Sequence, residues 1–175
     1  MIFKILIAVV VMVAIVLAIA AMRPDSFQVR RSVLIQAPPG KVYSLIDDFH
    51  EWPKWAPQDR DDSSMRRTYS GADRGVGAAS QWQGKGSTGE GQMRITESVP
   101  LTRVVVQTDF IKPFAAHNVN EFALEKEGDS TRVTWTMRGT NLYLMKLMSL
   151  FTNMERLMGK HFEAGLENLK DCAQR

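Results

Sequence analysis

The sequence predicts an α+β domain in which a curved antiparallel sheet is closed by one long C-terminal helix. Six short segments between residues 64 and 139 alternate apolar with polar residues, and Gly, Pro or Asp separates them. No helix-length segment interrupts them, so the crossovers of a parallel sheet are absent. From Asn141 to Cys172, apolar residues recur every three or four positions, as in an amphipathic helix.

The chain begins with a segment that is long enough to cross a bilayer. Ile5 to Met22 are 18 consecutive apolar residues, close to the about 20 that span a hydrocarbon core. Ala18-Ile19-Ala20 fits a cleavage site, but a signal peptide has a shorter apolar centre. We therefore expect a single-pass anchor over residues 1–22, a linker over 23–26 and one soluble domain over 27–175. Basic residues flank both ends of the anchor and do not orient it, although an extracytoplasmic domain is favoured.

Charge and cysteine content narrow the possible partners. The 22 basic and 19 acidic residues give a net charge of +3, and the basic ones are scattered, so nucleic acid is not an expected partner. Cys172 is the single cysteine, which excludes a disulfide within the chain and a thiolate metal cluster. We expect a monomer that needs no metal ion and no cofactor.

The domain opens with a strand and two short helical pieces. Residues Phe27 to Gln36 alternate in the manner of a strand. Two prolines end it, and Pro39 suits the first turn of a helix whose apolar stripe ends at Phe49. Trp52 to Pro57 holds two tryptophans between prolines, which predicts a second short helix or a tight turn with its rings in the core.

The sheet continues as a meander. The six further strands are predicted over Ser64 to Tyr69, Gly77 to Gly84, Gly89 to Glu97, Arg103 to Phe110, His117 to Glu127 and Thr131 to Gly139.

The C-terminal helix is expected to run unbroken for about 45 Å. Its first part, Leu142 to Phe151, is apolar on nearly all sides, which is more than one core-facing helix needs. This part can serve as a methionine-rich lid over a cavity, lie against the bilayer, or pack between the sheet and the short helices. All three remain open.

Several stretches resemble one known superfamily. They are Arg31 to Tyr43, Phe49 to Pro57, Gly91 to Ser98, Val133 to Met137 and Gly159 to Lys170. Together they resemble the START-like, polyketide cyclase/dehydrase (SRPBCC) superfamily over nearly all of residues 27 to 172. The resemblance implies a helix-grip (Bet v 1-like) fold with a deep apolar cavity. Members of this superfamily range from lipid carriers and hormone receptors to aromatic cyclases, so the fold alone selects no function.

Inward-facing parity along the strands, the helix stripe and a tryptophan of the Trp-Pro segment that could stack on a ligand predict the residues of a ligand cavity. They are Trp55, Trp82, Met93, Ile95, Glu97, Thr108, Phe110, Asn118, Asn120, Phe122, Trp135, Met154 and Met158. The polar members need one another, water or a ligand, because an unpaired buried polar group costs roughly 1 to 3 kcal/mol. Glu97, Thr108 and Asn120 form the predicted polar trio that orients a ligand.

Three functions fit these features. The first is a membrane-anchored module that binds a hydrophobic small molecule or lipid between sheet and helix. The second is a cyclase or dehydratase that uses Glu97 or His117 as a general base, although no nucleophile motif accompanies them. The third is a scaffold that presents its surface to a protein partner.

Overall fold

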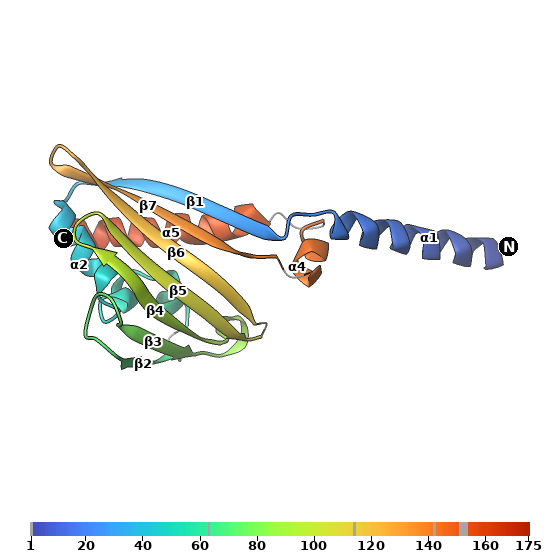
Figure 1. Ribbon diagram of the computed structural model, residues 1–175, viewed down its shortest axis with the longest axis horizontal. Coiled ribbons are helices and arrows are strands. Elements are labelled where there is room, and N and C mark those ends of the chain that lie inside the picture. The colour runs from blue at the N-terminus through green and yellow to red at the C-terminus, as the bar shows by residue number, and fades with distance from the viewer. Residues whose placement is uncertain (1, 63, 114, 142, 151–153) are drawn as a thin grey trace.

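A computed structural model describes residues 2–62, 64–113, 115–141, 143–150 and 154–175. The molecule is elongated, with helix α1 (Ile2–Ala21) projecting from one end of an α+β domain (Figure 1). By length and composition α1 could cross a membrane, and its most apolar stretch is not buried against the domain.

One antiparallel sheet of seven strands forms the body of the domain, as predicted. Its spatial order is β1-β7-β6-β5-β4-β3-β2. The last strand, β7, therefore lies between β6 and the first strand, β1. The strands are β1 (Ser26–Ile35), β2 (Arg66–Ser70), β3 (Ala79–Gln83), β4 (Glu90–Val99), β5 (Arg103–Lys112), β6 (Ala116–Glu127) and β7 (Ser130–Thr140). A short 3-10 turn, η2 (Gly86–Thr88), joins β3 to β4.

Three short helical pieces follow β1 and carry the two tryptophans into the core. They are α2 (Pro39–Asp47), the 3-10 turn η1 (Trp52–Lys54) and α3 (Pro57–Asp61), and each has a proline in its first turn. Indole N–H groups tie the pieces together, because Trp52 donates to the carbonyl of Ile46 at 2.9 Å and Trp55 to that of Leu45 at 2.9 Å. The predicted short helix or turn is therefore confirmed as η1 followed by α3.

The prediction of one continuous C-terminal helix is wrong. The chain forms α4 (Tyr143–Met148) and, after a break, α5 (Met154–Gln174). α4 packs against α1, whereas α5 lies along the sheet next to β1 (Figure 1). The additional apolar residues of α4 thus pack against α1 and not against the sheet. One straight helix could not contact both α1 and the sheet. Leu142 and Phe151, at the ends of the stretch, lie outside the described residues.

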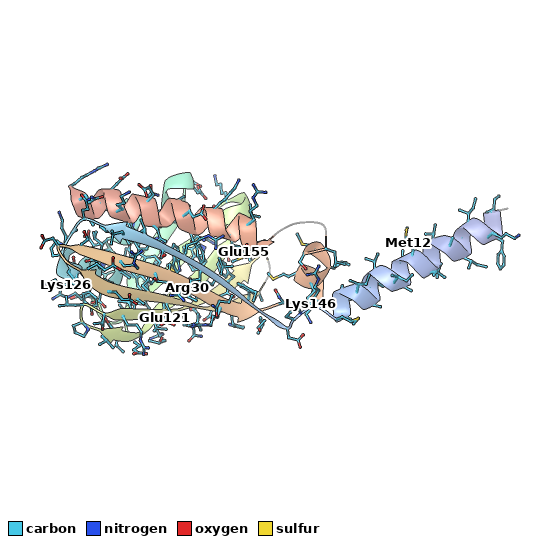
Figure 2. The ribbon with its side chains drawn as sticks, turned by 90° about the horizontal axis from the view of Figure 1, so that it is seen from above. Met12, Arg30, Glu121, Lys126, Lys146 and Glu155 are labelled. Carbon is cyan, nitrogen blue, oxygen red and sulfur yellow. The ribbon has the colours of Figure 1, made fainter. Side chains whose placement is uncertain are left out.

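α5 closes the inner face of the sheet and holds the core. Figure 2 shows it across one side of the sheet, with side chains in the space between the two. Phe162, Leu166 and Leu169 of α5 are almost fully buried, as are Val104 and Val106 of the opposing sheet. Burial of each such side chain contributes about 1.5 to 3 kcal/mol, so this layer is the main source of stability.

Candidate functional site

A cavity of about 320 Å³ lies between the sheet, the η1–α3 segment and the first half of α5. Its wall is mostly apolar and it is partly open to solvent. The lining residues are Trp52, Ala56, Pro57, Gln58, Met93, Thr108, Phe110, Asn120, Trp135, Met137, Leu157, Met158, His161 and Phe162. A concave, apolar site with a few polar groups is the usual form of a small-molecule pocket, and this volume is at the lower end of the usual range.

Stacked aromatic rings form one wall of the cavity. The ring of Trp135 lies 4.1 Å from that of Phe162, with an angle of 4° between their planes. Trp135 also contacts Phe122, with ring centroids 4.9 Å apart. α5 approaches this cluster at Gly165, where a β-carbon would stand 2.9 Å from Cζ3 of Trp135. The glycine therefore lets the helix seal the cavity on this side.

A directional chain of hydrogen bonds brings one hydroxyl into the cavity wall. Trp135 Nε1 donates to Oδ1 of Asn120 at 2.9 Å, and Asn120 Nδ2 donates to Oγ1 of Thr108 at 3.0 Å. An indole N–H can only donate, so it fixes the orientation of the Asn120 amide. Oγ1 of Thr108 must then accept the hydrogen bond from Asn120, and no described residue accepts a hydrogen bond from the Thr108 hydroxyl. The chain therefore presents a hydrogen-bond donor to whatever occupies the cavity.

Next to this chain of hydrogen bonds lies the side-chain oxygen of Asn118, which accepts no hydrogen bond from the described residues. Asn118 is 6% exposed, and its Oδ1 has no hydrogen-bond partner among the described residues. It pairs in register with Thr108 of β5 and with Gly139 of β7. A buried unpaired acceptor costs about 1 to 3 kcal/mol. Asn118 is not among the lining residues, so this atom lies behind the cavity wall, where its Oδ1 faces Gly139.

The solvent-accessible part of the lining marks the mouth of the cavity. Leu157 is exposed, and Gln58, Phe110, Met158 and His161 are half-buried, while the remaining lining residues are buried. The mouth therefore lies between the first turns of α5, the first turn of α3 and the end of β5.

The structure brings six of the predicted cavity residues into the lining and places the others elsewhere. Those in the lining are Met93, Thr108, Phe110, Asn120, Trp135 and Met158. Trp55, Trp82, Ile95 and Phe122 are buried in the core without lining the cavity. Asn118 is buried beside it. Met154 begins α5, and its side chain lies outside the described part of the structure.

The prediction that Glu97 faces the cavity is wrong. β4 carries a bulge after Ile95, so that Ile95 pairs with Val106 and Glu97 with the next residue, Val105. The extra residue reverses the inward and outward parity. Glu97 therefore points out and forms an ion pair with Arg103.

The same bulge turns Ser98 inward, where it contacts two side chains of α2. Ser98 donates to Asp47, and its hydroxyl lies 2.5 Å from that of Tyr43. Burial raises the pKa of Tyr43 above its ordinary value. This polar cluster pins α2 to β4 away from the cavity lining.

His117 also lies outside the cavity. Its side chain is 78% exposed on the outer face of the sheet, with Nδ1 2.7 Å from Oδ1 of Asp109. The hydrogen bond from His117 holds the pKa of Asp109 below its usual value, although burial acts in the opposite direction. The two proposed general bases thus both point away from the cavity, and the prediction of a cavity-facing base at Glu97 or His117 is wrong.

The part of the chain that the structure describes also has no cluster of His, Cys, Asp or Glu side chains with the spacing of a metal site.

Sequence reasoning missed most of the cavity wall that comes from the helical segments and one lining residue of β7. The missed lining residues are Trp52, Ala56, Pro57, Gln58, Met137, Leu157, His161 and Phe162. Met137 has the inward parity used for β7, and Phe162 lies on the apolar stripe of α5. The sequence therefore contained the information needed to predict Met137 and Phe162 as lining residues. Leu157 and His161 flank that stripe, and only the position of α5 over the sheet reveals their role.

Comparisons with known proteins place this geometry in a family. The family model described as polyketide cyclase / dehydrase and lipid transport matches residues 26–174. None of the curated proteins matches the sequence.

Solved structures with low sequence identity share the fold. Protein CV1439 from Chromobacterium violaceum is 17% identical over 87% of this chain and 99% of its own, with a TM-score of 0.60. Ara h 8.0201 is 12% identical over 85% of this chain and 98% of its own, with a TM-score of 0.59. The di-domain ARO/CYC StfQ from the steffimycin biosynthetic pathway is 9% identical over 85% of this chain and 51% of its own, with a TM-score of 0.64.

At these identities the structures show the fold alone, which is helix-grip. The family model covers most of the chain. This protein therefore belongs to the polyketide cyclase/dehydrase and lipid transport family.

Proposed function

We propose that this protein is a membrane-anchored binding module that holds a hydrophobic small molecule or lipid in the cavity between the sheet and α5. The observation that carries the proposal is the mostly apolar cavity of about 320 Å³, in which Thr108 supplies the one hydroxyl among the described lining residues. Apolar surface favours an apolar ligand, and the hydroxyl favours a ligand with one acceptor such as a carbonyl.

The lining chemistry supports binding over acid–base catalysis. Among the described lining residues His161 is the one titratable side chain, and none of them is an aspartate or a glutamate. Acid–base catalysis commonly pairs titratable groups whose environments separate their pKa values. Because Glu97 and His117 lie outside the cavity, the cyclase or dehydratase alternative has lost the residues that supported it.

The anchor rests on α1. Twenty residues at 1.5 Å each span about 30 Å, the thickness of a hydrocarbon core. Its apolar side chains are exposed on nearly all sides, as expected of a lipid-facing helix. A retained α1 makes the protein a single-pass membrane protein.

The test is to isolate the full chain from membranes in polymer-bounded nanodiscs and to identify bound molecules by native mass spectrometry. We expect a bound hydrophobic molecule in the wild type. Replacing Met158 with Trp fills the cavity and should remove it, whereas Ala164→Trp puts the same ring on the exposed face of α5 and should retain it. Equal occupancy in the two variants, or an empty wild-type protein, would contradict the proposal.

A further inference from the structure

α4 lies at the depth where a bilayer would end. Tyr143 donates a hydrogen bond to the carbonyl of Leu17 at 2.9 Å, one turn before α1 ends at Ala21. If α1 fills the hydrocarbon core, Leu17 and Ala21 are at its boundary, and α4 lies in the headgroup layer. Tyrosine is enriched at this depth, because its ring is apolar and its hydroxyl forms hydrogen bonds.

The connection between α1 and the domain leaves little freedom for the domain to move away. Four residues, Met22 to Asp25, separate the two, which is at most about 14 Å of extended chain. Asn141 pins this segment by donating its backbone N–H to Asp25 at 2.8 Å and its amide to Pro24 at 3.1 Å. Lys146 of α4 forms an ion pair with Asp25. The domain is therefore held close to the surface of the bilayer that contains α1.

Apolar side chains are exposed at this end of the domain. Figure 1 shows α4, the start of α5 and the hairpin between β5 and β6 at the end from which α1 projects. Figure 2 shows Lys146 and Glu155 at that same end. Tyr143 and Met148 of α4 are about half exposed, Ile111 at the end of β5 is 55% exposed, and Leu157 of α5 is 59% exposed. The short, pinned connection keeps these side chains at the end of the domain that adjoins α1.

The cavity mouth adjoins this surface. Leu157 belongs both to the exposed apolar set and to the cavity lining. Phe110 lines the mouth, and Ile111, the next residue of β5, lies at the same end of the strand with its side chain on the other face of the sheet. A molecule that leaves the cavity at the mouth therefore meets the surface that faces the anchor.

We propose that α4, the end of β5 and Leu157 rest on the bilayer that α1 crosses, and that the cavity exchanges its hydrophobic ligand directly with that bilayer. This inference rests on the proposed function, because it assumes that the cavity holds such a ligand. The occupant of the surface is the anchoring membrane, since the connection of four residues keeps it within reach.

The first experiment measures depth. In full-length protein with Cys172→Ser, an environment-sensitive nitrobenzoxadiazole label is attached at Ile111→Cys or at Val76→Cys. Val76 is a matched control, because it is an exposed β-branched residue, 59% exposed, in a loop beside Asp47 at the opposite end of the domain. In phosphatidylcholine and phosphatidylglycerol nanodiscs, spin-labelled lipids should quench the label at position 111 and not at position 76. Equal quenching at the two sites would overturn the proposal.

The second experiment measures exchange of 11-(dansylamino)undecanoic acid between the nanodisc lipid and the cavity. Ile111→Asp should slow exchange at least fivefold without changing occupancy at equilibrium, because Ile111 does not line the cavity. Val76→Asp should change neither. An unchanged exchange rate in Ile111→Asp would overturn direct exchange. Absence of cavity binding in the wild type would instead refute the proposed function, and the depth measurement would remain interpretable.

Discussion

The guanidinium of Arg31 lies against the backbone of Gly159, where a β-carbon would stand 1.9 Å from its Nη2. From there Arg31 of β1 reaches two carboxylates of α5, with Nη1 2.9 Å from Glu155 and Nε 2.7 Å from Glu163. The two glutamates lie one turn before and one turn after the glycine. The missing side chain thus makes room for a link between the first strand and the last helix.

Gly159→Ala should displace Arg31 and leave stability nearly unchanged. The alanine contributes about 1 kcal/mol of helix propensity, which offsets the loss of the ion pairs. We expect the melting temperature to move by less than about 3 °C. A double-mutant cycle checks the cause, because Arg31→Ala should cost less in the Gly159→Ala background than in the wild type. Additive effects would show that the two residues are independent.

Gly165→Ala, on the same helix, should destabilise the domain. Its β-carbon would stand 2.9 Å from the ring of Trp135 and 3.2 Å from Pro57, and neither rigid ring can turn away. Overpacking of this kind costs about 1 to 3 kcal/mol, which exceeds the gain of about 1 kcal/mol in helix propensity. Urea unfolding should give a net loss of about 1 to 2 kcal/mol. Gly159→Ala is the matched control, and equal stabilities would refute the argument.

Asp59→Ala should be among the most destabilising single changes in the domain. Asp59 of α3 and Arg67 of β2 form a bidentate ion pair at 2.5 and 2.6 Å, and their side chains are 7% and 5% exposed. Removing one partner leaves a buried charge, which costs about 3 to 5 kcal/mol. The double variant Asp59→Leu with Arg67→Met should recover much of this loss in denaturant unfolding. A loss below about 1 kcal/mol in Asp59→Ala would contradict the expectation.

Thr108→Val should lower the affinity for a ligand that carries an acceptor. The change keeps the shape of the side chain and removes the hydroxyl, which is worth about 0.5 to 1.5 kcal/mol, or about a two- to tenfold loss of affinity. Thr131→Val is the control, because Thr131 is buried and donates to Ala37 at 2.8 Å but does not line the cavity. Fluorescence titration with the dansyl fatty acid should separate the two variants. Equal affinities would remove Thr108 from the binding site.

Asp62→Ala should destabilise the protein at neutral pH and have no effect in strong acid. The hydroxyl of Ser64 and the backbone N–H groups of Lys85 and Ser64 lower the pKa of Asp62 to about 2. A lowered folded-state pKa means that the stabilisation is present above the unfolded-state value of about 4 and is lost as pH falls towards 2. Thermal unfolding between pH 2 and pH 7 should show the wild type and the variant converging. A constant difference across that range would argue against this role of the carboxylate.

Periodicity predicted the strands well because burial of one sheet face imposes a strict alternation. The alternation breaks down where a β-bulge inserts one extra residue into a strand, as it does in β4 before Glu97. No residue type between Met93 and Val99 indicates the bulge, because the bulge arises from the pairing of β4 with β5. The one polar residue that seemed best suited to catalysis was therefore placed on the wrong face.

The prediction of one continuous C-terminal helix was wrong for a different reason. Apolar spacing alone cannot tell whether Met145 and Met148 face the sheet or a second helix, because the two partners demand the same residue types. The surplus of apolar residues signalled an additional partner, and α1 is that partner. Likewise, the cavity wall contributed by Gln58 and His161 depends on how three elements meet, which periodicity within one element does not encode.

The pairing of β1 with β7 has a mechanical consequence. β1 follows α1 after four residues and runs antiparallel to β7 over ten residue pairs, from Ser26 with Thr140 to Ile35 with Thr131. Ladder hydrogen bonds lie across the strands, so tension applied through α1 along β1 would shear all of them together instead of peeling them one at a time. The domain is thus joined to α1 through a strand whose hydrogen bonds would have to break together.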